Sequence, residues 1–272
     1  MAQFTTSDGV TLHYDDQGSG APILCLAGLT RNALDFDYVL PHLRNNRLIR
    51  LDYRGRGRSD RADWHSYTVP VEARDALELL DHLDLAQTAI LGTSRGGLIA
   101  MMLAATAKHR LTGVALNDIG PEIALEGLAA IRGYIGRDPA VKTHAEAAAM
   151  MAQRMTGFAN VSASRWAEEA AKHFVATATG LTITYDPALA RAFDATADQP
   201  AADLWPLFDA MAGLPLALIR GANSDLLTRA TAAEMRRRRP DMIFALVPDR
   251  GHVPFLDEPE AIAALTDWSA QL

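Results

Sequence analysis

Short apolar segments alternate with amphipathic segments along most of the chain. The apolar segments consist mainly of Ile, Leu, Val and Ala, and their length suits single strands better than helices. The amphipathic segments repeat apolar residues at helical spacing, as in VEARDALELLDHL at residues 71–83. The pattern predicts strands at residues 10–14, 23–26, 48–51, 89–91, 114–116, 216–219 and 243–247, and helices at residues 33–43, 71–83, 95–108, 228–238 and 259–271.

This alternation predicts an α/β fold with a mostly parallel sheet flanked by helices, because strands that are apolar throughout must be buried on both faces. One long segment interrupts it. Residues 121–206 are rich in alanine, methionine and aromatic residues, have helical patterns and contain no clear buried strand. We therefore expect a core formed by residues 1–120 and 207–272, with residues 121–206 inserted as a helical cap.

Composition excludes several other classes of protein. The chain has 272 residues, of which 49% are hydrophobic and 22% charged, as in an ordinary globular protein. Its formal net charge of −7 argues against a nucleic-acid partner, which would call for a basic surface. The one basic run, at residues 236–239, ends a predicted helix, where cations complement the helix dipole.

The single cysteine and the amino-terminal segment bear on the cellular compartment. Cys25 has no second cysteine to pair with and lies in a predicted strand, so we expect a core residue. No basic region followed by an apolar stretch opens the chain, which predicts that there is no signal peptide. No apolar run approaches the roughly 18 residues that span a bilayer. We therefore expect a cytoplasmic protein that acts on a small molecule, with no membrane partner.

The sequence GTSRG at residues 92–96 lies between a predicted strand and a predicted helix. In the pattern G-x-S-x-G, the serine occupies a sharp strand-to-helix turn that exposes its hydroxyl, and the glycines let the two elements approach closely. Ser94 is therefore a candidate nucleophile. A serine hydroxyl is protonated at neutral pH, so it needs an adjacent base.

His252 is the candidate base among the eight histidines of the chain. It follows the predicted strand 243–247, in a loop marked by Gly251 and Pro254, whereas other histidines fall in predicted helices or in the cap. The alternative interpretation is a loop histidine that caps the helix beginning near Pro259.

An acid must orient the histidine, and two aspartates follow predicted strands. Asp225 follows the strand 216–219, and the order Ser94, Asp225, His252 is the one expected for this architecture. We predict Asp225 as the acid. Asp118, just after the strand 114–116, is the alternative, and its other role would be to fix the loop that leads into the cap.

An oxyanion formed by attack on a carbonyl needs hydrogen-bond donors. We predict the backbone N–H groups of Arg95, directly after the nucleophile, and of Leu29, in the loop after the strand 23–26. The side chain of Arg95 has two interpretations. It either pairs with an acid, which we favour, or attracts an anionic substrate and disfavours protonated His252.

Together, AGLTRN, DYRGRGRSD, GTSRGG, GANSDLL and GHVPFLDEPEAI resemble, in the same order, the motifs of the α/β-hydrolase fold superfamily. The resemblance covers the chain and implies that fold, with an inserted helical cap. Members often have His-Gly at the oxyanion loop, where this chain has Ala27 and Gly28. A serine nucleophile distinguishes it from the superfamily's haloalkane dehalogenases and epoxide hydrolases, which use aspartate.

These features predict a serine hydrolase that cleaves a small or medium-sized carboxylic ester. Hydrolysis of a carbon–carbon bond in a diketone, or of a lactone, is the alternative on the same residues, and a non-catalytic ligand receptor is the alternative from another class. No metal or organic cofactor is expected, because no histidine and carboxylate cluster has ligand spacing. Cap residues that could line an apolar acyl pocket, or pack within the cap, are Met150, Met151, Met155, Phe158, Trp166 and Phe174.

Overall fold

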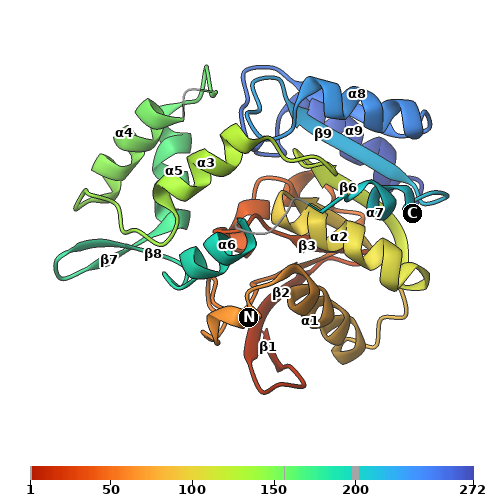
Figure 1. Cartoon of the computed structure of the whole chain (residues 1–272), viewed down its shortest axis with the longest axis horizontal. Helices are drawn as coiled ribbons and strands as arrows, with labels where there is room; N and C mark the ends of the chain where they lie inside the picture. Colours follow the sequence, from red (N-terminus) through yellow and green to blue (C-terminus); the bar gives the residue numbers. More distant parts are fainter. Residues whose placement is uncertain (1, 156, 198–201) are drawn as a thin grey trace.

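The computed structural model describes residues 2–155, 157–197 and 202–272. At its centre lies an eight-stranded sheet with the order β1-β2-β4-β3-β5-β6-β9-β10 (Figure 1). The strands from β4 to β10 in this order run parallel, and β1 and β2 are antiparallel to their neighbours. The strands are β1 Ala2–Thr5, β2 Thr11–Gln17, β3 Ala21–Leu26, β4 Asn46–Leu51, β5 Thr88–Thr93, β6 Leu111–Asn117, β9 Leu216–Gly221 and β10 Ile243–Val247.

Helices cover both faces of the sheet, which confirms the predicted α/β class. Apolar residues of α1 (Val69–His82), α2 (Arg95–Thr106) and α8 (Arg229–Arg238) join one core cluster. The opposite cluster contains residues of α9 (Pro259–Ser269). Every residue of β5 and β9 is buried, as expected for central parallel strands.

Two parts of the core differ from the sequence-based expectation. β1 was not predicted. The helix predicted over residues 33–43 is wrong, because two 3₁₀ turns, Ala33–Phe36 and Leu40–His42, occupy this segment. Pro41 lacks the N–H that a continuous helix would need there.

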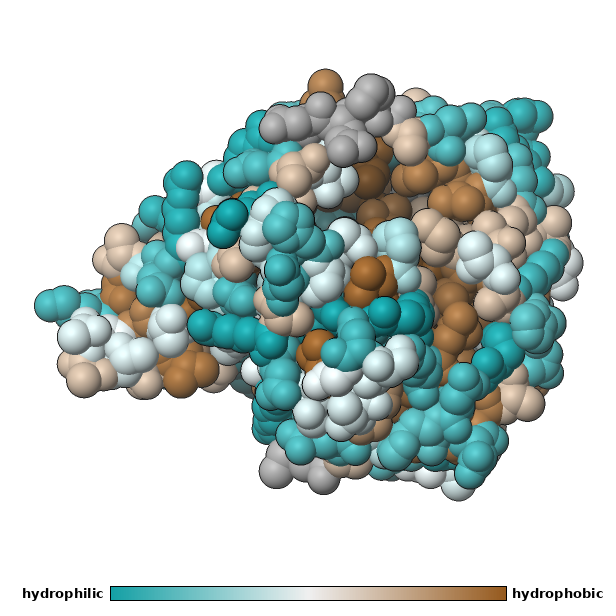
Figure 2. Space-filling model, turned by 60° about the horizontal axis from the view of Figure 1, so that its bottom comes forward, coloured by the Kyte–Doolittle hydropathy of each residue, from teal (hydrophilic) through white to brown (hydrophobic). Residues whose placement is uncertain are grey.

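The segment predicted as a cap lies partly to one side of the core, and its residues 144–155 and 157–183 lie in the arm at the left of Figure 2. It contains α3 (Leu125–Tyr134), α4 (His144–Arg154), α5 (Ala163–His173) and α6 (Leu189–Ala197). It also contains a short antiparallel hairpin that was not predicted, formed by β7 (Phe174–Thr177) and β8 (Gly180–Ile183). The short helix α7 (Trp205–Asp209) follows, and its Phe208 is buried in the main core. The boundaries at residues 121 and 206 stay a prediction.

Helix α5 packs against the loop that follows β3. The side-chain amide of Asn32 donates to the backbone carbonyl of Lys172 at 3.1 Å. The hydroxyl of Tyr38 donates to Glu169 Oε1 at 2.9 Å. This loop therefore joins the core to the projecting segment. In the described part of the chain, no helix combines the length and the apolar character needed to cross a membrane.

Candidate active site

Ser94 lies at a strained turn between β5 and α2. Its backbone has φ 49° and ψ −109°, a conformation that residues with a side chain rarely adopt. The glycines around it are required by close backbone contacts. A Cβ at Gly96 would lie 2.0 Å from the carbonyl oxygen of Leu26, and a Cβ at Gly92 would lie 2.6 Å from the carbonyl of Gly96. The glycine pattern thus lets strand and helix meet where the Ser94 hydroxyl is presented.

A hydrogen-bonded chain runs from Ser94 through His252 to Asp118. The Oγ of Ser94 lies 2.9 Å from Nε2 of His252, and Nδ1 of His252 lies 2.8 Å from Oδ2 of Asp118. A carboxylate only accepts hydrogen bonds, so Nδ1 carries the proton and Nε2 is free to accept from the serine. Asp118 is fully buried, and the His252 side chain is 16% exposed. This is the geometry in which a histidine can remove the serine proton.

The predicted partnership between Asp225 and His252 is wrong, because Asp118 occupies that position. Asp225 is exposed, and no hydrogen bond joins it to His252 in the described structure. The sheet order explains the difference. β6 pairs directly with β5, with Thr93 opposite Asn117, so the residue after β6 lies beside Ser94.

The loop after β9 supports the acid instead of supplying it. Ser224, one residue before Asp225, donates its hydroxyl to Asp118 Oδ2 at 2.5 Å. The amide of Gly221 donates to Asp118 Oδ1 at 2.9 Å. These bonds fix the rotation of the Asp118 carboxylate toward His252.

Asn117 is a residue of the site that sequence reasoning missed. Its side-chain amide donates to the hydroxyl of Thr93 at 3.2 Å and to the carbonyl of Pro254 at 3.1 Å. It therefore connects the ends of β5 and β6 with the loop that carries His252. The available signal was an asparagine at the end of an otherwise apolar strand.

The predicted oxyanion donors lie on the two segments next to Ser94. A Cβ at Gly28 would lie 3.9 Å from the Cβ of Ser94, so the loop carrying Leu29 passes close to the nucleophile. The carbonyl of Ala27 accepts from the amide of Gly96 at 3.1 Å and from the hydroxyl of Tyr53 at 3.0 Å, which braces this loop. Within the described ranges, the amides of Leu29 and Arg95 donate to no protein group. Their oxyanion role stays a prediction.

The side chain of Arg95 pairs with an acid, as favoured from the sequence. Its Nε donates to Glu72 at 2.7 Å, and its Nη2 donates to the carbonyl of Tyr67 at 3.1 Å. Glu72 is fully buried and also pairs with Arg56 at 2.9 Å. Burial alone would raise the pKa of Glu72, but the two guanidinium groups lower it. Arg95 thus belongs to a buried charge network below the site.

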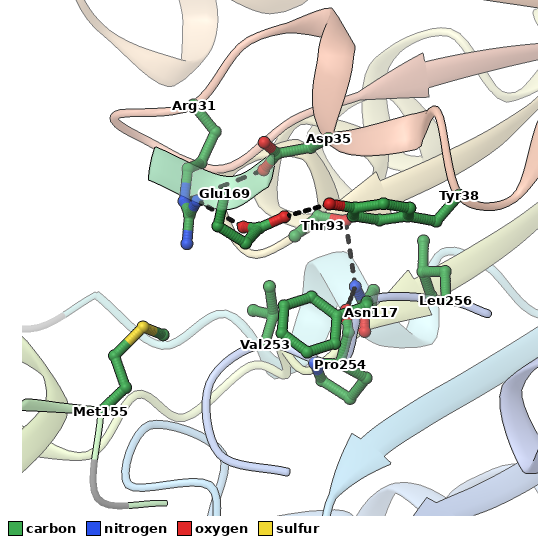
Figure 3. Close-up of a pocket in the computed structure, with 11 residues that line it drawn as sticks. Arg31, Asp35, Tyr38, Thr93, Asn117, Met155, Glu169, Val253, Pro254 and Leu256 are labelled. Carbon is green, nitrogen blue, oxygen red and sulfur yellow. Dashed lines mark hydrogen bonds and ion pairs between the residues drawn. The ribbon is translucent and has the colours of Figure 1, made fainter. Parts of the chain in front are cut away.

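A small pocket is lined in part by residues that adjoin Ser94, Asp118 and His252 in the sequence (Figure 3). These residues are Thr93, which precedes Ser94, Asn117, which precedes Asp118, and Val253, which follows His252. Its accessible interior is about 20 Å³, roughly the space of one water molecule. The remaining lining residues are Arg31, Asp35, Tyr38, Met155, Glu169, Pro254, Phe255 and Leu256.

Most of the cap residues considered for an acyl pocket pack within the projecting segment. Met151 and Trp166 are buried in its own apolar cluster, and Phe158 and Phe174 pack against that cluster. Met155 also lines the pocket beside Ser94. The described residues contain no group of histidine, cysteine and carboxylate side chains arranged to hold a metal.

Comparisons with known proteins agree with this fold. The sequence matches the alpha/beta hydrolase fold family over residues 21–259. A crystal structure of an alpha/beta hydrolase from Novosphingobium aromaticivorans superposes with a TM-score of 0.93 at 37% identity, covering 100% of this chain and 98% of that one.

Two relatives align over nearly the whole sequence. A protein of Cupriavidus necator named 3-hydroxybutyrate-oligomer hydrolase is 36% identical over 261 residues, which are 92% of this chain and 88% of that protein. A 2-(acetamidomethylene)succinate hydrolase of Mesorhizobium japonicum is 26% identical over 263 residues, covering 95% and 91%. Both names describe hydrolases. The chain belongs to the alpha/beta hydrolase fold family.

Proposed function

We propose that the protein is a serine hydrolase of carboxylic esters that works through an acyl-enzyme intermediate. The observation that carries this proposal is the continuous hydrogen-bonded chain from Ser94 through His252 to Asp118. In this proposal Asp118 is the acid, in place of Asp225. A serine with a base and an orienting acid is the arrangement that activates a hydroxyl for acyl transfer.

The proposed reaction has two steps. Ser94 Oγ attacks the ester carbonyl while Nε2 of His252 takes the hydroxyl proton, and the amides of Leu29 and Arg95 stabilise the oxyanion. The imidazolium, held by Asp118, then gives the proton to the leaving alcohol. A water molecule, deprotonated by His252, then attacks the acyl-enzyme; the imidazolium returns the proton to Ser94 Oγ, and the acid is released.

The relatives suggest the substrate class. The Cupriavidus necator relative is named for oligomers of 3-hydroxybutyrate, whose units are joined by ester bonds. The Mesorhizobium japonicum relative is named for a substituted succinate. Both named substrates carry free carboxylates. We therefore propose short oligoesters of hydroxy acids as substrates.

The test is a screen of the purified protein against p-nitrophenyl esters of graded chain length, 3-hydroxybutyrate dimers, lactones and diketones. Ester hydrolysis that is lost in Ser94→Ala, with an unchanged melting temperature, supports the proposal. A serine-directed phosphonate should label the wild type and leave Ser94→Ala unlabelled. Turnover of lactones or diketones alone would replace the ester assignment. Tight binding of a small molecule with background hydrolysis in every case would indicate a receptor.

A further inference from the structure

Arg31 is a cation in the pocket that the proposed reaction does not use. It lies two residues after Leu29, on the loop that carries the proposed oxyanion amide, and lines the pocket beside Ser94. A Cβ at Gly28 would lie 3.2 Å from Cγ of Arg31 and 3.9 Å from Cβ of Ser94. The aliphatic part of the Arg31 side chain and the Cβ of Ser94 therefore flank the same glycine.

Two acids neutralise the guanidinium of Arg31 without a hydrogen bond to either of them. Its Nε lies 3.8 Å from Asp35 and its Nη1 lies 3.6 Å from Glu169, both longer than a hydrogen bond. Nη1 donates to Nδ1 of His173 at 3.0 Å. Burial and the nearby cations Arg31 and Lys172 hold the pKa of His173 well below its usual range, so this partner is neutral.

One end of the guanidinium faces the open part of the pocket. No hydrogen bond joins Nη2 of Arg31 to any residue that the structure describes, and the side chain is 20% exposed. Figure 3 shows Asp35 and Glu169 on one side of the guanidinium, with Val253 and Met155 across the open space. A planar group with free N–H donors suits a carboxylate, which it can bind through parallel hydrogen bonds.

The charges around Arg31 are balanced without a ligand. The negative charges of Asp35 and Glu169 offset the positive charges of Arg31 and Lys172. Asp37 is paired with Arg50. Lys172 lies over the ring of Tyr38, makes no hydrogen bond within the described structure and forms an ion pair with Asp37 at 3.7 Å, so its positive charge is shared among Asp37 and the two acids. The Oδ1 of Asp35 is buried and also lacks a hydrogen-bond partner. A ligand carboxylate at Arg31 would compete with both acids, Asp35 at 3.8 Å and Glu169 at 3.6 Å.

We propose that Arg31 binds a free carboxylate of the substrate and thereby selects the ester bond nearest to that end. The inference rests on the proposed ester hydrolase function and defines its substrate as a carboxylated ester. In an oligomer of a 3-hydroxy acid, a single unit separates the terminal carboxylate from the last ester bond. With the carboxylate at Arg31, that ester bond is the one presented to Ser94, and the leaving alcohol is the free hydroxy acid.

The experiment compares a 3-hydroxybutyrate dimer bearing a free carboxylate with its methyl ester, assayed on wild type and variants. Arg31→Gln should lower kcat/KM for the free acid by about 10–100-fold, the effect of losing hydrogen bonds to a charged group. The loss of kcat/KM should be at least about tenfold smaller for the methyl ester and for p-nitrophenyl acetate, because neither carries the carboxylate. Arg31→Lys should restore part of the preference, because it keeps the charge but loses the planar fork. Arg237→Gln, which removes an exposed arginine on α8, is the control with the same change in net charge.

The result that would overturn the inference is an equal loss on charged and neutral esters, or no loss on either. If Arg31→Gln fails to fold, Asp35→Asn tests the same idea, because removing the competing carboxylate should increase the preference for the free acid. An unchanged or lower preference would then refute it. If the wild type does not hydrolyse p-nitrophenyl acetate either, the ester hydrolase function itself fails, and the two failures are distinguished.

Discussion

The assignment of the acid to Asp118 makes a quantitative prediction for Asp118→Asn. The Oδ1 of Asp118 accepts from the amide of Gly221 at 2.9 Å, and its Oδ2 accepts from His252 and Ser224. In the variant, the side-chain oxygen must face the Gly221 amide, because an NH₂ group there would oppose another donor. The NH₂ group then faces Nδ1 of His252.

This orientation forces the wrong tautomer on the histidine. Nδ1 becomes an acceptor, the ring proton moves to Nε2, and Nε2 can no longer accept the proton of Ser94. Loss of the correct tautomer lowers kcat by about 10³–10⁴ in enzymes with this arrangement. This corresponds to a rise in the activation free energy of about 4–5.5 kcal/mol.

The assay is steady-state hydrolysis of p-nitrophenyl acetate by wild type, Asp118→Asn and the matched control Asp225→Asn. We expect Asp225→Asn to stay within about threefold of wild type, because its side chain is exposed and makes no bond to His252. Thermal unfolding of each variant separates loss of chemistry from loss of fold. A larger loss in Asp225→Asn than in Asp118→Asn would refute the reasoning.

Three further predictions follow from the core, the cap and the pocket. Gly96→Ala should prevent stable folding or abolish activity, because its Cβ would lie 2.0 Å from a backbone oxygen; a melting temperature and activity equal to wild type would contradict this. Trp166→Ala should destabilise the protein by about 3–5 kcal/mol in urea unfolding, whereas Met155→Ala should mainly shift the kcat/KM ratio of short to long esters, by about tenfold. Burial raises the pKa of Asp35 to about 6, so the carboxyl group holds its proton more tightly in the folded state than in the unfolded state. As pH rises from about 4 to 7, the wild type should therefore lose stability relative to Asp35→Asn. Stability profiles of the two proteins that run parallel over this range would contradict the prediction.

The sequence was sufficient to predict seven of the eight strands of the main sheet, the turn at Ser94 and the proximity of His252. Each depends on a local pattern, such as an apolar strand, a glycine cluster or a loop after a strand. The acid could not be chosen in this way. Asp118 and Asp225 both follow strands, and the choice depends on β6 pairing with β5, which is a property of the sheet order.

Other misses have a similar origin. The segment at residues 33–43 has helical spacing of Phe36 and Val39, but Pro41 begins a second short turn instead of continuing the one that Asn32 caps. The hairpin β7–β8 is only four residues long on each side, too short for its alternation to stand out. Pairing of Arg95 with an acid was predicted, but Glu72 as that acid was not, since the two are 23 positions apart in the chain.

The meeting of Asp118 and Ser224 at one carboxylate oxygen has a consequence for how such sites diverge. The Ser224 hydroxyl lies 2.5 Å from the atom of Asp118 that holds His252. The ends of two neighbouring strands therefore reach the same point in space, one with an acid and the other with a hydroxyl. A lineage that exchanged these two residue types would move the acid by about a hundred positions in the sequence while His252 and Ser94 kept their places. Position along the chain is then a weaker marker of common descent for the acid than for the nucleophile or the base.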